Sequence, residues 1–253
     1  MAIIYKSYNN WKVQDTIYPL FKHVLSLFEG IFGQKLMNEA SCYVYVDSNC
    51  ATAPIILSSP MRIVLKASHS CPCAFIFELA HELTHYAIKQ RTDNEYVNTC
   101  AVAAFEEPAC SAMSLYILKL YSERLDDNML CQNNCRFTTE KSLKKNLENY
   151  RKDRYLENEQ DSCKTYKEWT SICNRFTGQI TSACERPKVG KMRNHLYDSF
   201  VQMPDRIIDF IDYPLYLRSI PFDKLIDSDK WKADKPQSAE FIQKICEIQP
   251  ALA

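Results

Sequence analysis

Apolar residues recur at helical spacing in several separate stretches of the chain. They repeat every three or four residues over 15–32, where Gly33 marks an expected stop, and again over 73–90 and 96–124. Pro108 interrupts the third stretch, either as a break or as the first residue of a new helix. Further helical patterns cover 191–217, interrupted at Pro204, and 238–248. The chain is therefore expected to be mainly helical.

Short runs of strand-forming residues lie between the first two helical stretches. Tyr43-Val44-Tyr45-Val46 is rich in them, and two more apolar runs, 54–57 and 61–66, flank Ser58-Ser59-Pro60. This pattern predicts a sheet of two or three strands. The polar residues at 126–137 and 151–164 indicate loops or weak helix, and 141–152 mixes both charges as a solvated helix face does.

Composition supports a helical protein with a substantial core. The chain has 253 residues but only 4 glycines, which favours helix over sheet or phosphate-binding loops. We predict an α+β, mainly α fold. Its core with the N-terminal helix is expected at 1–125, and a helical C-terminal region at 126–253.

Charge and cysteine content exclude some classes of protein. Thirty-one basic and 31 acidic residues leave no basic excess for binding nucleic acid or an anionic membrane. No apolar run approaches the ~18–20 residues that cross a bilayer, and no secretory leader is apparent. We expect a cytoplasmic protein whose 12 cysteines are mostly thiols.

One motif carries recognisable chemistry. His81-Glu82-Leu83-Thr84-His85 has the form H-E-x-x-H inside a helical stretch. Residues four apart on a helix are only about 40° apart around its axis, so the two imidazoles can converge on one metal ion. Glu82 follows the first imidazole directly, where its carboxylate can reach a water at that ion.

A catalytic zinc site needs a third protein ligand and an open position. Glu106 and Glu107 follow His85 by 21 and 22 residues, which leaves room for a turn and a second helix. Small residues follow the pair, so the two helices can approach closely. Both glutamates are candidates for the third ligand.

These motifs resemble the gluzincin class of zinc metallopeptidases, which includes thermolysin-like and ImmA/IrrE-like proteins. The resemblance covers about residues 40–122. It implies a zincin-like core with a small sheet, an H-E-x-x-H helix and a glutamate helix. It further implies Zn²⁺ as cofactor, His81, His85 and Glu107 as metal ligands, and hydrolysis of a peptide or protein substrate. The class commonly has an acidic residue four positions after the third ligand, whereas Ser111 stands there in this chain.

The expected mechanism uses Glu82 as general base toward a metal-activated water. A donor to the developing oxyanion is also required. Four residues are candidates, without a choice among them: Tyr86, His195, Tyr197 and Tyr213.

Two alternatives to hydrolysis remain open. The chain can be a non-hydrolytic zinc-binding regulatory or interaction module on a zincin scaffold, or a helical interaction protein with an accidental motif.

The other cysteines and histidines of the chain form weaker patterns than the H-E-x-x-H motif. Cys71-Pro72-Cys73 is expected to be a simple capping loop, and no standard zinc spacing joins the later cysteines (Cys131, Cys135, Cys163, Cys173 and Cys184) or the isolated His23 and His69.

Overall fold

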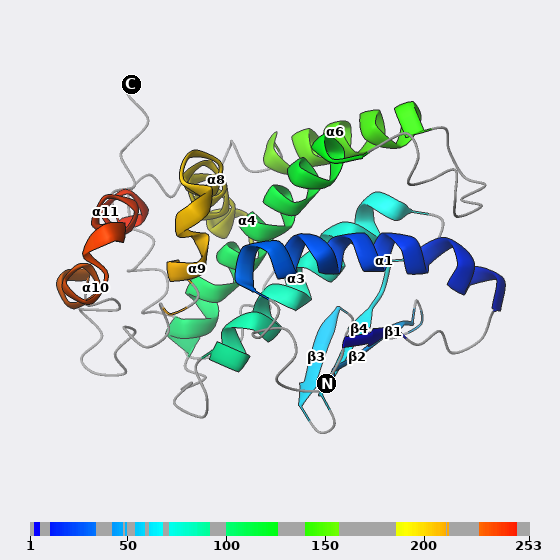
Figure 1. The fold of residues 1–253 in the computed structure, drawn as a ribbon, viewed down its shortest axis with the longest axis horizontal. Coiled ribbons are helices and arrows are strands. Elements are labelled where there is room, and N and C mark those ends of the chain that lie inside the picture. Colours follow the sequence, from blue (N-terminus) through cyan, green and yellow to red (C-terminus); the bar gives the residue numbers. More distant parts are fainter. Residues whose placement is uncertain are drawn as a thin grey trace. The chain divides into compact units, whose positions relative to one another are not determined.

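A computed structural model describes residues 3–5, 11–33, 42–47, 49, 54–58, 61–67, 71–91, 100–125, 140–156, 186–210, 212 and 228–246. Most of these residues are helical, and four short strands form one sheet, so the α+β, mainly α class is confirmed (Figure 1).

The chain divides into two compact units. One contains Met1–Gln90 and Met113–Asp153, and the other contains Arg91–Ala112 and Arg154–Ala253. The predicted boundary after residue 125 adjoins residues 126–139, which lie outside the described residues, and it stays a prediction.

The sheet has the strand order β1-β2-β4-β3. Strands β1 (Ile3–Tyr5), β2 (Cys42–Val46) and β4 (Met61–Leu65) are parallel, and β3 (Ile55–Ser58) is antiparallel to β4. The expectation of at most three strands was wrong because β1 is only three residues long, too short to show a period.

Helix α1 (Trp11–Phe32) begins four residues before the predicted start. It ends at Gly33, whose φ of 83° lies in the left-handed region that glycine adopts without strain. The amide of Gly33 donates to the Glu29 carbonyl at 2.9 Å and closes the last turn. Most of the predicted apolar face is buried, namely Leu20, Phe21, Val24, Phe28 and Phe32, whereas Leu25 and Ile31 are half-buried. Leu27 is buried as well, although it was not predicted.

Two long helices follow the sheet. Helix α3 spans Pro72–Arg91, close to the predicted 73–90, and α4 spans Cys100–Glu123. Pro108 does not break α4, although a proline inside a helix removes one main-chain hydrogen bond. The apolar residues that follow it are buried, and this packing offsets the loss. The buried residues after it are Ala109, Cys110, Ala112 and Met113.

A single carboxylate joins the sheet to α3. Oε2 of Glu78 accepts hydrogen bonds from the backbone amides of Lys66 at 2.8 Å and Ala67 at 2.7 Å, directly after β4 ends. These amides have no partner strand to bond, so Glu78 satisfies them and fixes the end of β4 against the second turn of α3.

Helix α6 (Glu140–Leu156) fits the predicted solvated face. Leu143 and Leu147 are buried, whereas Lys144, Lys145 and Glu148 are exposed. The expectation of loop or weak helix from residue 151 was wrong for 151–156, which continue α6 although they are too polar to show an apolar period.

The second unit contains short helices around an aromatic core. Helix α8 (Arg186–Gln202) ends before Pro204, as predicted, and η1 (Pro204–Arg206) and α9 (Ile207–Phe210) follow. Next come α10 (Ser228–Asp234), which was not expected, η3 (Pro236–Ser238) and α11 (Ala239–Cys246). Phe200 contacts the rings of both Phe210 and Phe241, and Phe210 also contacts Trp231.

Polar contacts tie these short helices together. The Lys235 ammonium lies 3.0 Å from Asp209 and 2.6 Å from Asp212, and the Ser238 hydroxyl donates to Asp209. The Nε2–H of His195 in α8 donates to the Lys244 carbonyl in α11 at 2.6 Å. Among the described residues, no helix is long and apolar enough to span a bilayer.

Candidate metal centre

Helix α3 places the two motif histidines on its more accessible side. His81 and His85 are half-buried, whereas Leu79, Leu83 and Ala87 are fully buried. The apolar residues fix the rotation of the helix, because burying them is favourable, and the histidines must then share the other side.

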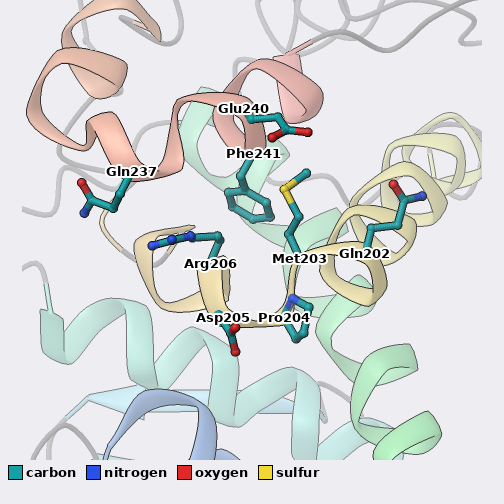
Figure 2. Close-up of a pocket in the computed structure, with 8 residues that line it drawn as sticks. All are labelled: Gln202, Met203, Pro204, Asp205, Arg206, Gln237, Glu240 and Phe241. Carbon is teal, nitrogen blue, oxygen red and sulfur yellow. The ribbon is translucent and has the colours of Figure 1, made fainter.

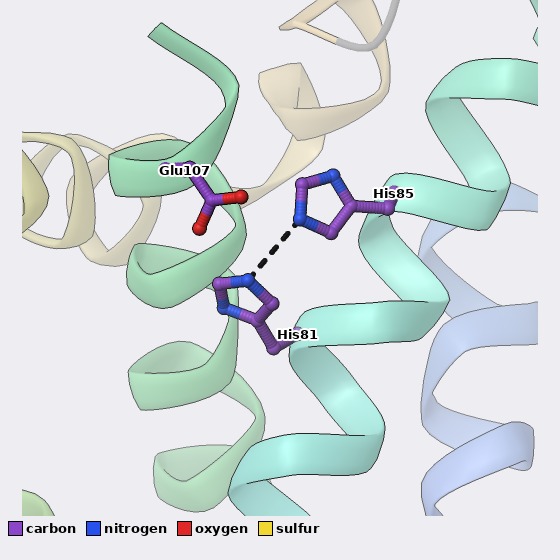
Figure 3. A group of neighbouring side chains, drawn as sticks. All are labelled: His81, His85 and Glu107. Carbon is purple, nitrogen blue, oxygen red and sulfur yellow. Dashed lines mark hydrogen bonds between the residues drawn. The ribbon is translucent and has the colours of Figure 1, made fainter. Parts of the chain in front are cut away.

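The imidazoles converge in the way that the spacing predicted. Their Nε2 atoms lie 3.1 Å apart, with ring centroids at 4.9 Å and planes inclined by 66° (Figure 3). Two nitrogens bound to one tetrahedral zinc at about 2.0–2.1 Å are roughly 3.3 Å from each other. The observed separation is close to that value, so the pair fits a shared zinc ion with little movement.

Helix α4 approaches α3 through a specific contact. The Ser114 hydroxyl donates to the Phe77 carbonyl of α3 at 2.9 Å. Glu107 precedes Ser114 by about two turns on one continuous helix, and the histidines follow Phe77 by one and two turns. An antiparallel arrangement of these segments therefore brings Glu107 level with the two imidazoles.

The Glu107 carboxylate completes a three-residue group. A carboxylate oxygen of Glu107 and one nitrogen each of His81 and His85 all lie within 4.8 Å of one another. Figure 3 shows the carboxylate directed toward the two rings. Two imidazoles and one carboxylate are a donor set that suits zinc and leaves a fourth position for water. Glu106, the other candidate, is grouped with His85 and Cys110 and not with both histidines.

Glu82 is deeply placed for a charged residue. Only 4 % of it is exposed. It follows His81 by one residue, about 100° around the helix, and lies outside the group of metal ligands. The neighbouring Thr84 donates its hydroxyl to the Ala80 carbonyl at 2.7 Å within the same helix.

The candidate oxyanion donors have different surroundings. Tyr86 is fully buried, and the Nε2–H of His195 is used by the Lys244 carbonyl. Tyr197 is buried, and its ring meets Tyr155 edge-on at 5.7 Å. Tyr213 lies outside the described residues. The choice among these four stays open.

Within the part of the chain that the structure describes, the other predicted sulfur and histidine patterns do not add ligands to this centre. Cys71 and Cys73 are free thiols; burial, with a smaller contribution from Cys71, raises the pKa of Cys73 to about 11. His23 lies edge-on to Tyr121 at 4.4 Å, and burial followed by the nearby Arg124 lowers its pKa. The remaining predicted positions fall outside the described residues: His69, Cys131, Cys135, Cys163, Cys173 and Cys184.

Three residues of this region were missed as contributors. Ser114 bonds the Phe77 carbonyl, and the next residue, Glu78, bonds the end of β4, so both contacts hold the second turn of α3. Cys110 belongs to a second group of potential ligands. The spacing of Glu106 and Cys110, four apart on one helix, was the available signal for the last of them.

A pocket of about 300 Å³ lies in the second unit (Figure 2). It contains no residue of the motif, and both charges occur around it. Its lining consists of Gln202, Met203, Pro204, Asp205, Arg206, Gln237, Glu240 and Phe241.

Comparison of the chain with protein-family models, with curated proteins and with solved structures found no match. The resemblance to gluzincins therefore depends on the motif, and the function must be argued from the geometry of His81, His85 and Glu107.

Proposed function

We propose that the protein is a zinc-dependent metallopeptidase that hydrolyses peptide bonds in a peptide or protein substrate. His81, His85 and Glu107 hold the ion, and the zincin-like core is formed by the sheet, α3 and α4. The proposal is carried by one observation: the three ligand atoms lie within 4.8 Å of one another, with the two Nε2 atoms 3.1 Å apart.

The bound zinc would supply a Lewis acid that polarises the substrate carbonyl and makes a water molecule more acidic. The residues of the chain perform the proton transfers. A carboxylate oxygen of Glu82 accepts the proton of the attacking water and then delivers it to the nitrogen of the leaving amine. The burial of Glu82 supports this role, because a buried carboxylate is shielded from bulk water and retains the proton between the two steps.

Peptide cleavage by the variant E82Q tests the base. The amide has nearly the same size as the carboxylate but does not take up the proton, so we expect unchanged zinc content and a loss of turnover of more than about 100-fold. E123Q is the matched control, since Glu123 is exposed on α4 and pairs with Lys119. Hydrolysis by E82Q at the wild-type rate would exclude this base.

A peptide library digested with and without a chelator separates the remaining possibilities. Cleavage that stops on chelation and returns with zinc supports the peptidase. Stoichiometric zinc without cleavage of any peptide would favour the non-hydrolytic binding module. Well-folded protein that binds no zinc would exclude both.

A further inference from the structure

A second group of metal-ligand side chains overlaps the first. One nitrogen of His85, a carboxylate oxygen of Glu106 and the sulfur of Cys110 all lie within 4.8 Å of one another. His85 belongs to both groups, whereas the adjacent residues Glu106 and Glu107 belong to different ones. We infer that His85, Glu106 and Cys110 form an alternative, thiolate-containing metal site that competes with the first site for His85.

The helix geometry explains why the two groups are separate. Glu106 and Cys110 are four residues apart on α4 and therefore share one face, whereas Glu107 is about 100° away from Glu106. Glu106 is 2 % exposed and Cys110 is 0 % exposed, while Glu107 is half-buried. Glu106 and Cys110 thus occupy the more deeply buried face of α4. His85, on α3, belongs to the groups on both faces.

The donor atoms set the kind of ion. The first group offers nitrogen and oxygen only, whereas the second adds a thiolate after Cys110 releases its proton to solvent. Thiolate sulfur is a soft ligand, so the second group favours a thiophilic divalent ion, for which Cd²⁺ is a convenient probe.

Sharing of His85 has a functional consequence. The inference takes Nε2 of His85, which lies 3.1 Å from Nε2 of His81, as the ligand atom in both groups. One nitrogen lone pair binds one ion at a time. An ion held by Cys110 and Glu106 takes His85 away from His81 and Glu107. The inference depends on the proposed zinc centre but not on peptide hydrolysis, and it makes a thiophilic ion an inhibitor that acts by displacing zinc.

The test uses the full chain with Cd²⁺ and reads the ultraviolet absorption of the cadmium–thiolate bond. We expect C110S to lose the absorption of one cadmium–thiolate bond. Its affinity for Cd²⁺ should fall more than about 100-fold, which is a larger loss than removal of a side chain that only hydrogen-bonds to a metal ligand causes. C71S, which changes an exposed thiol near α3, is the matched control and should keep the wild-type spectrum. Identical spectra for C110S and the wild type would overturn the inference.

Two further variants guard against misfolding of C110S. E106Q keeps the thiol and should also weaken Cd²⁺ binding, whereas H81N should keep the thiolate signal because His81 belongs to the first group only. Retention of the signal by H81N, even if no peptide is cleaved, distinguishes failure of the proposed peptidase from failure of this site. An H81N protein that lost the signal would contradict the separate ligand sets.

Zinc release tests the competition. When zinc-loaded protein is titrated with Cd²⁺, one zinc ion should leave for each Cd²⁺ that produces the Cys110 signal. Simultaneous binding of zinc at His81 and Cd²⁺ at Cys110 in one chain would overturn the sharing of His85.

Discussion

The hydroxyl of Ser114 donates a hydrogen bond to the carbonyl of Phe77, and this contact sets the register of α4 against α3. Phe77 lies one turn before His81, and Ser114 lies about two turns after Glu107. The register that the hydroxyl selects is therefore the one that places the Glu107 carboxylate beside the imidazoles.

Replacement of Ser114 by alanine should loosen this register. We expect S114A to lower the free energy of unfolding by about 1 kcal/mol and to weaken zinc binding as well, since the donor is buried. Urea denaturation and a zinc titration measure the two effects. S122A is the control, because the Ser122 hydroxyl bonds the Lys119 carbonyl within its own helix. Equal zinc affinity in S114A and S122A would show that the hydrogen bond between Ser114 and Phe77 does not position the Glu107 ligand.

The ligand assignment predicts an asymmetry between two adjacent glutamates. E107Q, like H81N, should weaken zinc binding more than about 100-fold, because each removes a direct ligand. E106Q should leave zinc affinity within a few-fold of the wild type, because Glu106 is not grouped with both histidines. Isothermal titration calorimetry of the three variants decides the matter, and the opposite order would make Glu106 the third ligand.

Glu78 is expected to be essential to the packing of α3 on the sheet. E78A leaves the Lys66 and Ala67 amides without their acceptor, so the free energy of unfolding should fall by about 1–3 kcal/mol. E123A removes only an exposed ion pair and should change it by less than about 1 kcal/mol. A thermal denaturation series compares them. Equal stability of the two variants would contradict the proposed link.

Stability should depend on pH through His195. Burial lowers the pKa of its imidazole below 6.5, an effect that the Lys244 carbonyl and the Asp198 carboxylate only partly oppose. The unfolded chain then binds the proton more readily than the folded chain. The stability that the neutral ring provides is present above pH 6.5 and is lost as the pH falls toward the folded-state pKa.

Urea denaturation of wild type and H195Q at pH 7 and pH 5 checks this sign. The wild type should lose more stability than H195Q on acidification. His23 also has a lowered pKa, so H23Q should remove a separate part of the same dependence. A wild-type protein that gains stability between pH 7 and pH 5 would show that the assigned direction is wrong.

The sequence pattern predicted the parts of the structure that follow a regular period. The apolar positions of α1, the helix around His81 and the end of α8 before Pro204 could be read directly, because burial repeats with the helical turn. The convergence of His81 and His85 also followed from a local spacing.

Contacts between distant segments could not be read in the same way. Lys66 and Glu78 are 12 residues apart, and Phe77 and Ser114 are 37 apart, so no local period links either pair. The three residues of β1 gain their strand conformation from pairing with β2 and not from their own pattern. Similarly, only the rotation of α4 decides which of Glu106 and Glu107 meets both histidines.

The proline inside α4 has a consequence for how the centre can adapt. Pro108 follows Glu107 directly and has no amide hydrogen for the Ala104 carbonyl, so the main chain of α4 is weakest one residue beyond the carboxylate. Small bends at that point would move the Glu107 carboxylate while the Ser114 hydrogen bond keeps the rest of α4 in place. We therefore expect the proposed centre to adapt to ions of different radius through Glu107 alone.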